Sequence, residues 1–233
     1  MDQLNQKLTA EEISQLLRKT ALFLVFMALA IFLPAWTLDY WQGWLFLIVF
    51  AVLTAGASLY FIKYDPALVR RRANVGAKAE TEPTQKRIMT FNSVAMIATI
   101  ILAPLDHRFM WSNVPGIVCV IALALMVLGY ALTIATLITN TWAAATITVE
   151  QNQLVISDGL YGLVRHPMYS GGILMFAAMP VALGSYWGLV PAAAIAAGII
   201  WRLLDEERVL AARLPGYDDY CRRVRYRLLP GVW

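Results

Sequence analysis

The chain has 233 residues, of which 60% are hydrophobic and 15% charged, and its formal net charge is +4. This composition, together with apolar runs long enough to cross a bilayer, excludes a soluble globular domain and indicates an all-α polytopic membrane protein. The basic residues are sorted by loop and form no single face, which argues against nucleic-acid binding. Two cysteines and two histidines favour neither a disulfide framework nor a metal centre, so we expect no metal site.

Four apolar runs in the first part of the chain are long enough to span ~30 Å of hydrocarbon at ~1.5 Å per residue. They are residues 20–38, 41–62, 88–105 and 114–139. Before them, Thr9 and Glu12 fit a capping box, which predicts a short interfacial helix leading into the first span. The polar loop 63–87 carries three consecutive arginines at 70–72, for which we expect a topological role or a contact with lipid headgroups.

The remaining chain begins with a polar segment, 140–166, in which residues 146–150 alternate as a short strand would. Two apolar runs follow, 168–183 and 189–204, and their short connection predicts a tight helical hairpin. We expect the second helix to continue past the membrane until Pro215 and Gly216 end it. The chain thus divides into an N-terminal helical part, 1–139, and a region of different character, 140–233, with about six apolar helices in all.

Lysine and arginine predict the orientation. With the N-terminus inside, the inside segments 1–19, 63–87, 140–166 and 202–233 hold three, seven, one and seven of them, and Arg108 alone lies outside. The positive-inside rule therefore places both termini and the polar segments around residue 165 in the cytoplasm.

Residues 159–172 stand out because a basic residue, a histidine, a proline and a tyrosine meet the start of a long apolar run. Pro167 suits the first position of a helix, and it favours extended geometry at His166. A helix that begins there leaves the amides of Met168, Tyr169 and Ser170 without intrahelical partners. These amides and the helix dipole would form a site for a carboxylate or phosphate, beside Arg165 and His166.

The far end of the predicted hairpin carries the opposite charge. Arg202 and three acidic residues, 205–207, end the second helix, and antiparallel packing would bring them close to Arg165 and His166. A zwitterionic ligand would suit a pocket of this kind. The alternative is an ordinary helix surface, since Arg202 and Glu206 are four residues apart and could pair with each other.

At these residues the chain resembles the isoprenylcysteine carboxyl methyltransferase family, integral-membrane enzymes that use S-adenosylmethionine and are related to phospholipid methyltransferases. The resemblance rests on Arg-His-Pro-Met-Tyr-Ser-Gly at 165–171, the Glu-Glu pair at 206–207, Tyr-Asp-Asp-Tyr at 217–220 and a basic stretch ending in Leu-Leu-Pro-Gly at 228–231. It covers about residues 140–233. The tail has Val-Arg-Tyr-Arg at 224–227 where the eukaryotic enzymes have Val-Pro-Arg. In this respect the chain resembles a bacterial branch of the family, which implies a location in the bacterial inner membrane.

The resemblance implies a cytoplasmic cofactor pocket without a Rossmann domain, and an acceptor that enters from the bilayer. The acceptor would be a lipophilic small molecule or a lipidated carboxylate, thiol or amine, and membrane lipids would surround the protein. The implied cofactor-binding residues are Arg165, His166, Pro167, Met168, Tyr169, Gly171, Glu206, Glu207, Tyr217 and Tyr220. Arg202 and Glu206 are the implied catalytic residues. Arg202, or a tail arginine in its place, would orient an anionic acceptor, and Glu206 or His166 would take the proton from an amine or thiol acceptor.

Two other functions fit the same sequence. A sterol-type membrane reductase shares the C-terminal helices but binds NADPH, for which more basic residues and more spans would be expected. A non-catalytic lipid-binding membrane protein would use the charged helix ends only to seal the hairpin. The sequence leaves the identity of the acceptor and the oligomeric state open.

Overall fold

The computed structural model describes residues 6–73, 76–80, 82–143, 145–146 and 153–233. Within these residues the chain is a bundle of long helices without strands, which confirms the predicted all-α class. Residues 147–150 of the expected strand lie outside the described residues. In chain order the helices are α1 (Ala10–Ala35), α2 (Trp41–Tyr64), α3 (Pro66–Arg71), α4 (Pro83–Phe109), α5 (Gly116–Thr139), the 3₁₀ turn η1 (Gly159–Gly162), α6 (Pro167–Ala182), α7 (Leu189–Arg213) and α8 (Tyr217–Arg223).

Four of the helices, α1, α2, α4 and α5, are long and apolar enough to cross a membrane, and α6 is a shorter apolar helix. The capping box is confirmed, because the Thr9 hydroxyl accepts from the Glu12 amide and the Glu12 side chain accepts from the Thr9 amide. The predicted interfacial helix is continuous with the first span, so both form α1. The hairpin is also confirmed, and α7 runs to Arg213, well beyond its apolar part.

Two short helices were not expected from the sequence. The loop 63–87 contains α3, which starts at Pro66 and is capped by the Asp65 carboxylate accepting from the Leu68 amide at 2.9 Å. The tail contains α8, which starts directly after Gly216, a glycine with φ +83°. Each is too short for periodicity to reveal it, and packing against the bundle stabilises both.

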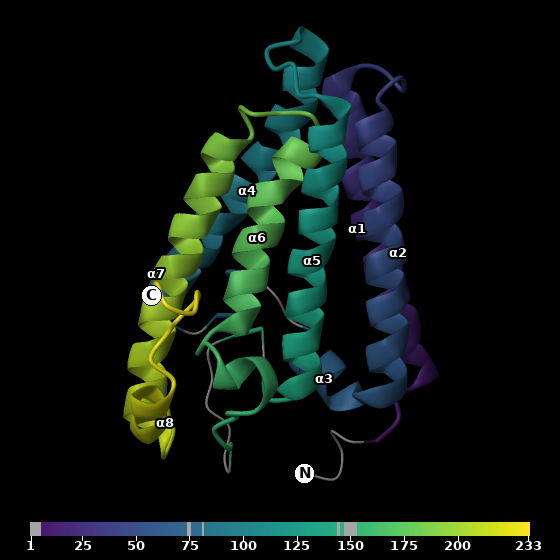
Figure 1. Ribbon diagram of the computed structural model, residues 1–233. Helices are drawn as coiled ribbons and strands as arrows, with labels where there is room; N and C mark the ends of the chain where they lie inside the picture. Colours follow the sequence, from purple (N-terminus) through teal and green to yellow (C-terminus); the bar gives the residue numbers. More distant parts are fainter. Residues whose placement is uncertain (1–5, 74–75, 81, 144, 147–152) are drawn as a thin grey trace.

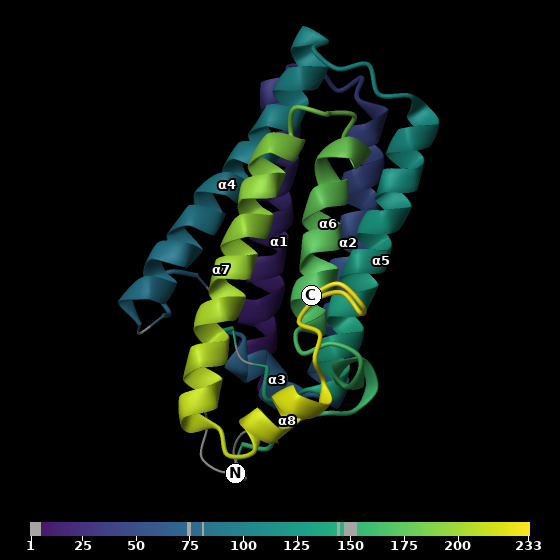
Figure 2. The ribbon, with the colours of Figure 1, turned by 60° about the vertical axis from the view of Figure 1, so that its left-hand side comes forward.

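The helices pack so that α6 lies between α5 and α7, while α4 lies beside α7 and α1. Both views show α3, α8 and the start of α1 at one end of the bundle, which we call the α3–α8 end (Figures 1 and 2). The connections between α1 and α2, α4 and α5, and α6 and α7 lie at the opposite end. The assignment of the α3–α8 end to the cytoplasm stays a prediction from the distribution of basic residues.

The largest apolar core fills the half of the bundle toward the opposite end. Its fully buried members include Ile31, Tyr40, Phe46, Met126 and Leu183, contributed by three helices and two connections. Toward the α3–α8 end the bundle opens around two cavities. The polar residues singled out in the sequence lie at this open end.

Candidate functional site: a two-part cavity at the α3–α8 end

A cavity of about 530 Å³ lies among α4, α5, α6, α7, α8 and the segment 153–156. Its volume is within the range of small-molecule sites. One part, near the start of α6 and the end of α7, is polar and aromatic. The other part lies between α4, α6 and α7 and is mostly apolar, with the lining residues Met89, Met96, Met175, Phe176, Ile195 and Ile199. The cavity therefore suits a polar molecule in contact with a lipophilic one.

Most of the residues singled out in the sequence meet in this cavity. Those that line it are Arg165, His166, Met168, Tyr169, Arg202, Glu206, Tyr217 and Tyr220. Pro167, Gly171 and Glu207 do not line it. The structure thus brings the start of α6, the end of α7 and the tail together, as the hairpin implied. The role of each residue in binding or catalysis stays a prediction.

The start of α6 has the predicted form only in part. His166 is the residue before the helix and Pro167 is its first residue, as expected. However, the amides of Tyr169 and Ser170 both donate to the His166 carbonyl at 3.1 Å. The expectation of three free amides is therefore wrong for these two, because the helix closes its first turn on His166. The Met168 amide has no hydrogen-bond acceptor in the part of the chain that the structure describes.

Glu207 joins the tail to the start of α6. Its carboxylate forms an ion pair with Arg165 at 3.0 Å, and it accepts hydrogen bonds from His166 at 3.2 Å and from Arg227 at 2.8 Å. Burial raises the pKa of Glu207, but the hydrogen bonds from His166 and Arg227 outweigh it, so its pKa lies below the ordinary value. Backbone hydrogen bonds also join the start of α6 to the tail, since the amides of Arg165 and His166 donate to tail carbonyls at 2.9 Å. Glu207 therefore holds one wall of the cavity in place.

Arg202 is held by groups that the sequence did not indicate. Its guanidinium donates to Glu80 at 2.7 Å, to Gln85 at 2.9 Å and to the Ala145 carbonyl at 3.0 Å. Glu80 and Gln85 are both buried, and Gln85 also bonds Asp205. Nothing in the sequence separates Glu80 from the other charged residues of its loop. Only the packing of that loop against α7 shows that it neutralises Arg202.

Tyr169 connects Arg202 to Glu206. The Tyr169 hydroxyl accepts from Arg202 Nε at 3.2 Å and donates to Glu206. Glu206 takes part in no ion pair among the described residues, although it borders the cavity. The i,i+4 pairing of Arg202 with Glu206 that the sequence allowed is replaced by the pair of Arg202 with Glu80. The Glu206 carboxylate thus presents negative charge to the cavity, fixed in orientation by Tyr169.

Buried polar atoms without partners also border the cavity. Among the described residues these are Arg165 Nε, the Tyr217 hydroxyl and Asn92 Oδ1. Burial raises the pKa of Tyr161 to about 12, and it also raises the pKa values of Tyr217 and Tyr220. These phenols therefore stay neutral near pH 7 and can donate hydrogen bonds. Unsatisfied buried groups are costly, which favours a ligand that would pair with them.

Gly171 lies where α6 crosses α5. A Cβ added there would stand 2.6 Å from the Gly129 carbonyl oxygen and 2.8 Å from the Thr133 hydroxyl. Gly129 is restricted in the same way by the backbone of α6. The pair allows the two helices to approach closely, as small residues do in membrane bundles. Gly171 thus shapes the site by setting the distance between α5 and α6.

Comparisons with known proteins agree with a membrane enzyme. Residues 114–214 match the family model described as phospholipid methyltransferase, a range that contains α5, α6 and α7. The chain is also similar to the Delta(14)-sterol reductase TM7SF2 of Mus musculus, with 33% identity over 89 residues. That match covers 37% of this chain and 21% of the mouse protein, so the chain spans about a fifth of that relative's length.

Proposed function

We propose that the protein is a membrane methyltransferase that uses S-adenosylmethionine to methylate a lipophilic or lipidated acceptor, in the manner of isoprenylcysteine carboxyl methyltransferases. The family match over 114–214 supports membrane methyl transfer in general. The observation that carries the proposal is Glu206, a carboxylate that borders an aromatic-lined cavity and has no ion-pair partner among the described residues. Such a carboxylate favours a cationic ligand.

The residues of the polar part fit this cofactor. S-adenosylmethionine supplies an activated methyl group on a positively charged sulfur, together with a carboxylate, an ammonium and an adenosine. Glu206 would bind one of the positive groups, and the ring faces of Tyr169 and Tyr217 would attract the other. Arg165 Nε and the Met168 amide would donate to the carboxylate, and the Tyr217 hydroxyl to a ribose or adenine atom.

The apolar part of the cavity would hold the acceptor. It lies between α4, α6 and α7, so a lipophilic molecule would lie along the helices with its polar group toward Glu206. Positioning and exclusion of water would supply most of the catalysis, because the methyl donor is already activated. Arg202 would act by fixing Tyr169 and Glu206, since its donors are engaged by Glu80, Gln85 and the Ala145 carbonyl.

A second candidate is an NADPH-dependent reductase of the sterol type. The similarity to the mouse sterol reductase favours it. It predicts that the same cavity binds NADPH, whose 2′-phosphate would need a cation. Arg165 and Arg202 are already paired with Glu207 and Glu80, which leaves Arg72 as the lining arginine without an ion pair among the described residues. A non-catalytic lipid-binding protein would bind neither NADPH nor S-adenosylmethionine.

Calorimetric binding of S-adenosylhomocysteine to the purified protein in a neutral detergent tests the proposal. We expect binding by the wild type and a loss of about tenfold or more in Glu206→Gln, as removal of a charged hydrogen bond implies. His166→Ala should also weaken binding, because His166 lines the cavity and contacts Glu207, which holds the cavity wall. The control Asp219→Asn removes an exposed carboxylate at the same end and should bind normally. Thermal unfolding shows whether each variant is folded. NADPH binding in place of S-adenosylhomocysteine, or binding that Glu206→Gln leaves unchanged, would overturn the proposal.

A further inference from the structure

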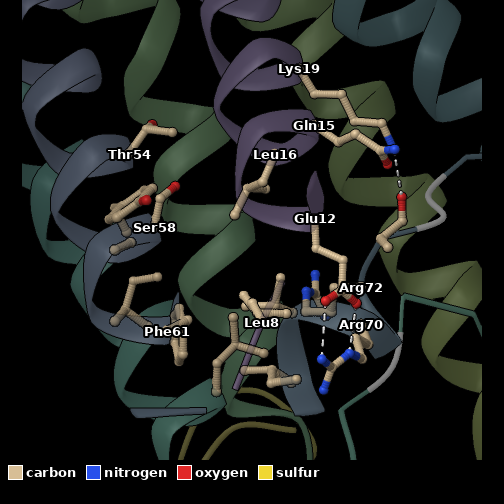
Figure 3. Close-up of a pocket in the computed structure, with 17 residues that line it drawn as sticks. Leu8, Glu12, Gln15, Leu16, Lys19, Thr54, Ser58, Phe61, Arg70 and Arg72 are labelled. Atoms are coloured by element: carbon tan, nitrogen blue, oxygen red, sulfur yellow. Dashed lines mark hydrogen bonds and ion pairs between the residues drawn. The ribbon is translucent and has the colours of Figure 1, made fainter. Parts of the chain in front are cut away.

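A second cavity, of about 400 Å³, lies between α1, α2, α3 and α5. Figure 3 shows Thr54, Ser58 and Phe61 of α2 on one side and Leu16 of α1 on the other. The walls are mostly apolar, with Leu8, Ala57, Leu68, Val69, Ile134 and Leu137 among the lining residues. Neither the family match, which begins at residue 114, nor the proposed methyl transfer assigns a ligand to this space.

The end of this cavity near α3 is positively charged. Its charged lining residues are Lys19, Arg70 and Arg72 against the single carboxylate of Glu12. Glu12 is engaged by Arg70, whose Nε and second guanidinium nitrogen donate to it at 2.8 Å and 3.1 Å (Figure 3). Among the described residues, the one hydrogen bond that the Lys19 ammonium donates is a long one of 3.4 Å, to the Ala73 carbonyl. The excess positive charge therefore lies on Lys19 and Arg72.

Arg72 has a particular position, because it lines this cavity and also the cavity that contains Glu206. It is partly buried, and the one hydrogen bond of its guanidinium within the described residues goes to the Ala143 carbonyl at 3.1 Å. No carboxylate among those residues pairs with it. Burial lowers the pKa of Arg72, and the charge of the nearby Arg202 contributes in the same direction. A partly buried guanidinium that has no carboxylate partner is a strong site for a carboxylate or phosphate.

We propose that the second cavity binds a single-chain membrane amphiphile with an acidic head, with its hydrocarbon chain between α1, α2 and α5 and its head on Arg72. The volume is at the lower end of the range for small-molecule sites, which suits one chain. The excess of cations at one end complements an acidic head. Since Arg72 borders both cavities, the head would lie next to the proposed cofactor site. The inference does not require methyl transfer, because binding is measured without a cofactor.

Native mass spectrometry of the protein in a neutral detergent tests this site with oleate and with oleyl alcohol, its uncharged counterpart. We expect one oleate per chain and about tenfold weaker binding of the alcohol, because a charged hydrogen bond is lost. Arg72→Gln should reduce oleate binding to the level of the alcohol, whereas Arg72→Lys retains part of it. The control Lys63→Gln removes an exposed charge outside both cavities and should not change binding.

Ser58→Phe tests this cavity independently of the cavity that contains Glu206, because Ser58 lines the first and not the second. The added ring should weaken both oleate and oleyl alcohol while S-adenosylhomocysteine still binds. Oleate binding that survives Ser58→Phe, or equal binding by the wild type and Arg72→Gln, would overturn the proposal. Tighter Arg72-dependent binding of phosphatidylglycerol than of oleate would overturn the single-chain assignment.

Thermal unfolding without added amphiphile gives an independent readout. Removing an uncompensated charge should leave the unfolding temperature of Arg72→Gln equal to or above that of the wild type. A clear decrease would show that Arg72 serves the fold through Ala143, and would contradict the proposed role.

Discussion

The two ends of the bundle use polar side chains in different ways. At the opposite end, the buried Asp106 accepts from the amide and hydroxyl of Ser112, both at 2.6 Å, and from the hydroxyl of Ser185. The Tyr40 hydroxyl there donates to the Leu183 carbonyl. These bonds tie the α4–α5 and α6–α7 connections together above the apolar core. Both oxygens of the Asp106 carboxyl are thus engaged by donors of the protein itself.

At the α3–α8 end, some polar groups form ion pairs or hydrogen bonds within the protein, while others that border a cavity have no hydrogen-bond partner among the described residues. Arg165 pairs with Glu207 while its Nε has no partner among the described residues. Five buried side-chain atoms have no partner among the described residues. Those of Thr54, Asn92, Arg165 and Tyr217 border the two cavities, and Gln42 Oε1 lies at the opposite end. Most of the unpaired buried atoms therefore gather around the two cavities of the α3–α8 end, which favours ligand binding there.

The largest effect should come from Asp106→Ala at the closed end. The change leaves the donors of Ser112 and Ser185 buried without an acceptor, so we expect a loss of about 3 kcal/mol in the free energy of unfolding. Thermal unfolding in detergent measures it, and Asp39→Asn, at an exposed aspartate of the same end, is the control. An unchanged unfolding temperature would remove the distinction between the two ends.

Gly171→Ala should cost about 2 kcal/mol, since overpacking a tight helix crossing typically costs 1–3 kcal/mol. The new Cβ would meet the Gly129 carbonyl oxygen at 2.6 Å, and backbone cannot move aside as a side chain can. The neighbouring Gly172→Ala meets only the end of Ile199, at 4.0 Å, and should be neutral or slightly stabilising. If both variants unfold alike, the α5–α6 contact does not set the geometry of the cavity.

The pH dependence of the unfolding temperature should show how much the ionised Glu207 carboxylate stabilises the fold. Because its pKa is lowered in the folded protein, its contribution is fully present above the ordinary carboxyl pKa. It is lost as the pH falls through the lowered folded value. The difference in unfolding temperature between the wild type and Glu207→Gln should therefore be largest near neutral pH and shrink in acid. The exposed Asp218→Asn should show no such trend, and a constant difference for Glu207→Gln would contradict the pairing.

The smallest stability effects distinguish two tyrosines of the cavity wall. The Tyr220 hydroxyl donates to the Tyr161 carbonyl at 2.8 Å, so Tyr220→Phe should cost about 1 kcal/mol. The Tyr217 hydroxyl has no partner among the described residues, so Tyr217→Phe should not lower stability. Calorimetry should instead show weaker binding of S-adenosylhomocysteine by Tyr217→Phe. Normal binding by that variant would mean that the unpaired hydroxyl does not face the ligand.

Much of the fold follows from local sequence. The apolar runs gave the long helices, the capping box placed the start of α1, and Pro167 placed the start of α6. The short connection at 184–188 gave the hairpin and, with it, the proximity of His166 to Glu207 at 3.2 Å. These features depend on residues close in the chain, where periodicity, capping and chain length act directly.

The candidate site could be predicted from the sequence only in part. The residues at 165–169, 202–207 and 217–220 could be selected because unusual polar groups gather beside apolar runs. Which of them remain available to a ligand could not be read from the chain, because that depends on their partners. Arg202 is neutralised by Glu80, 122 positions away, whereas Glu206 has no such partner among the described residues.

The sequence by itself determined the membrane class, the hairpin and the segment that carries the polar residues, since each arises from local composition and spacing. The tertiary structure alone decided that Glu207 braces the tail while Glu206 faces the cavity, and that Gly171 sets the distance to α5. It also placed Arg72 between two cavities. The reason is physical: a charge becomes structural or available according to the groups that packing brings within hydrogen-bond distance, and those groups lie far apart in the chain.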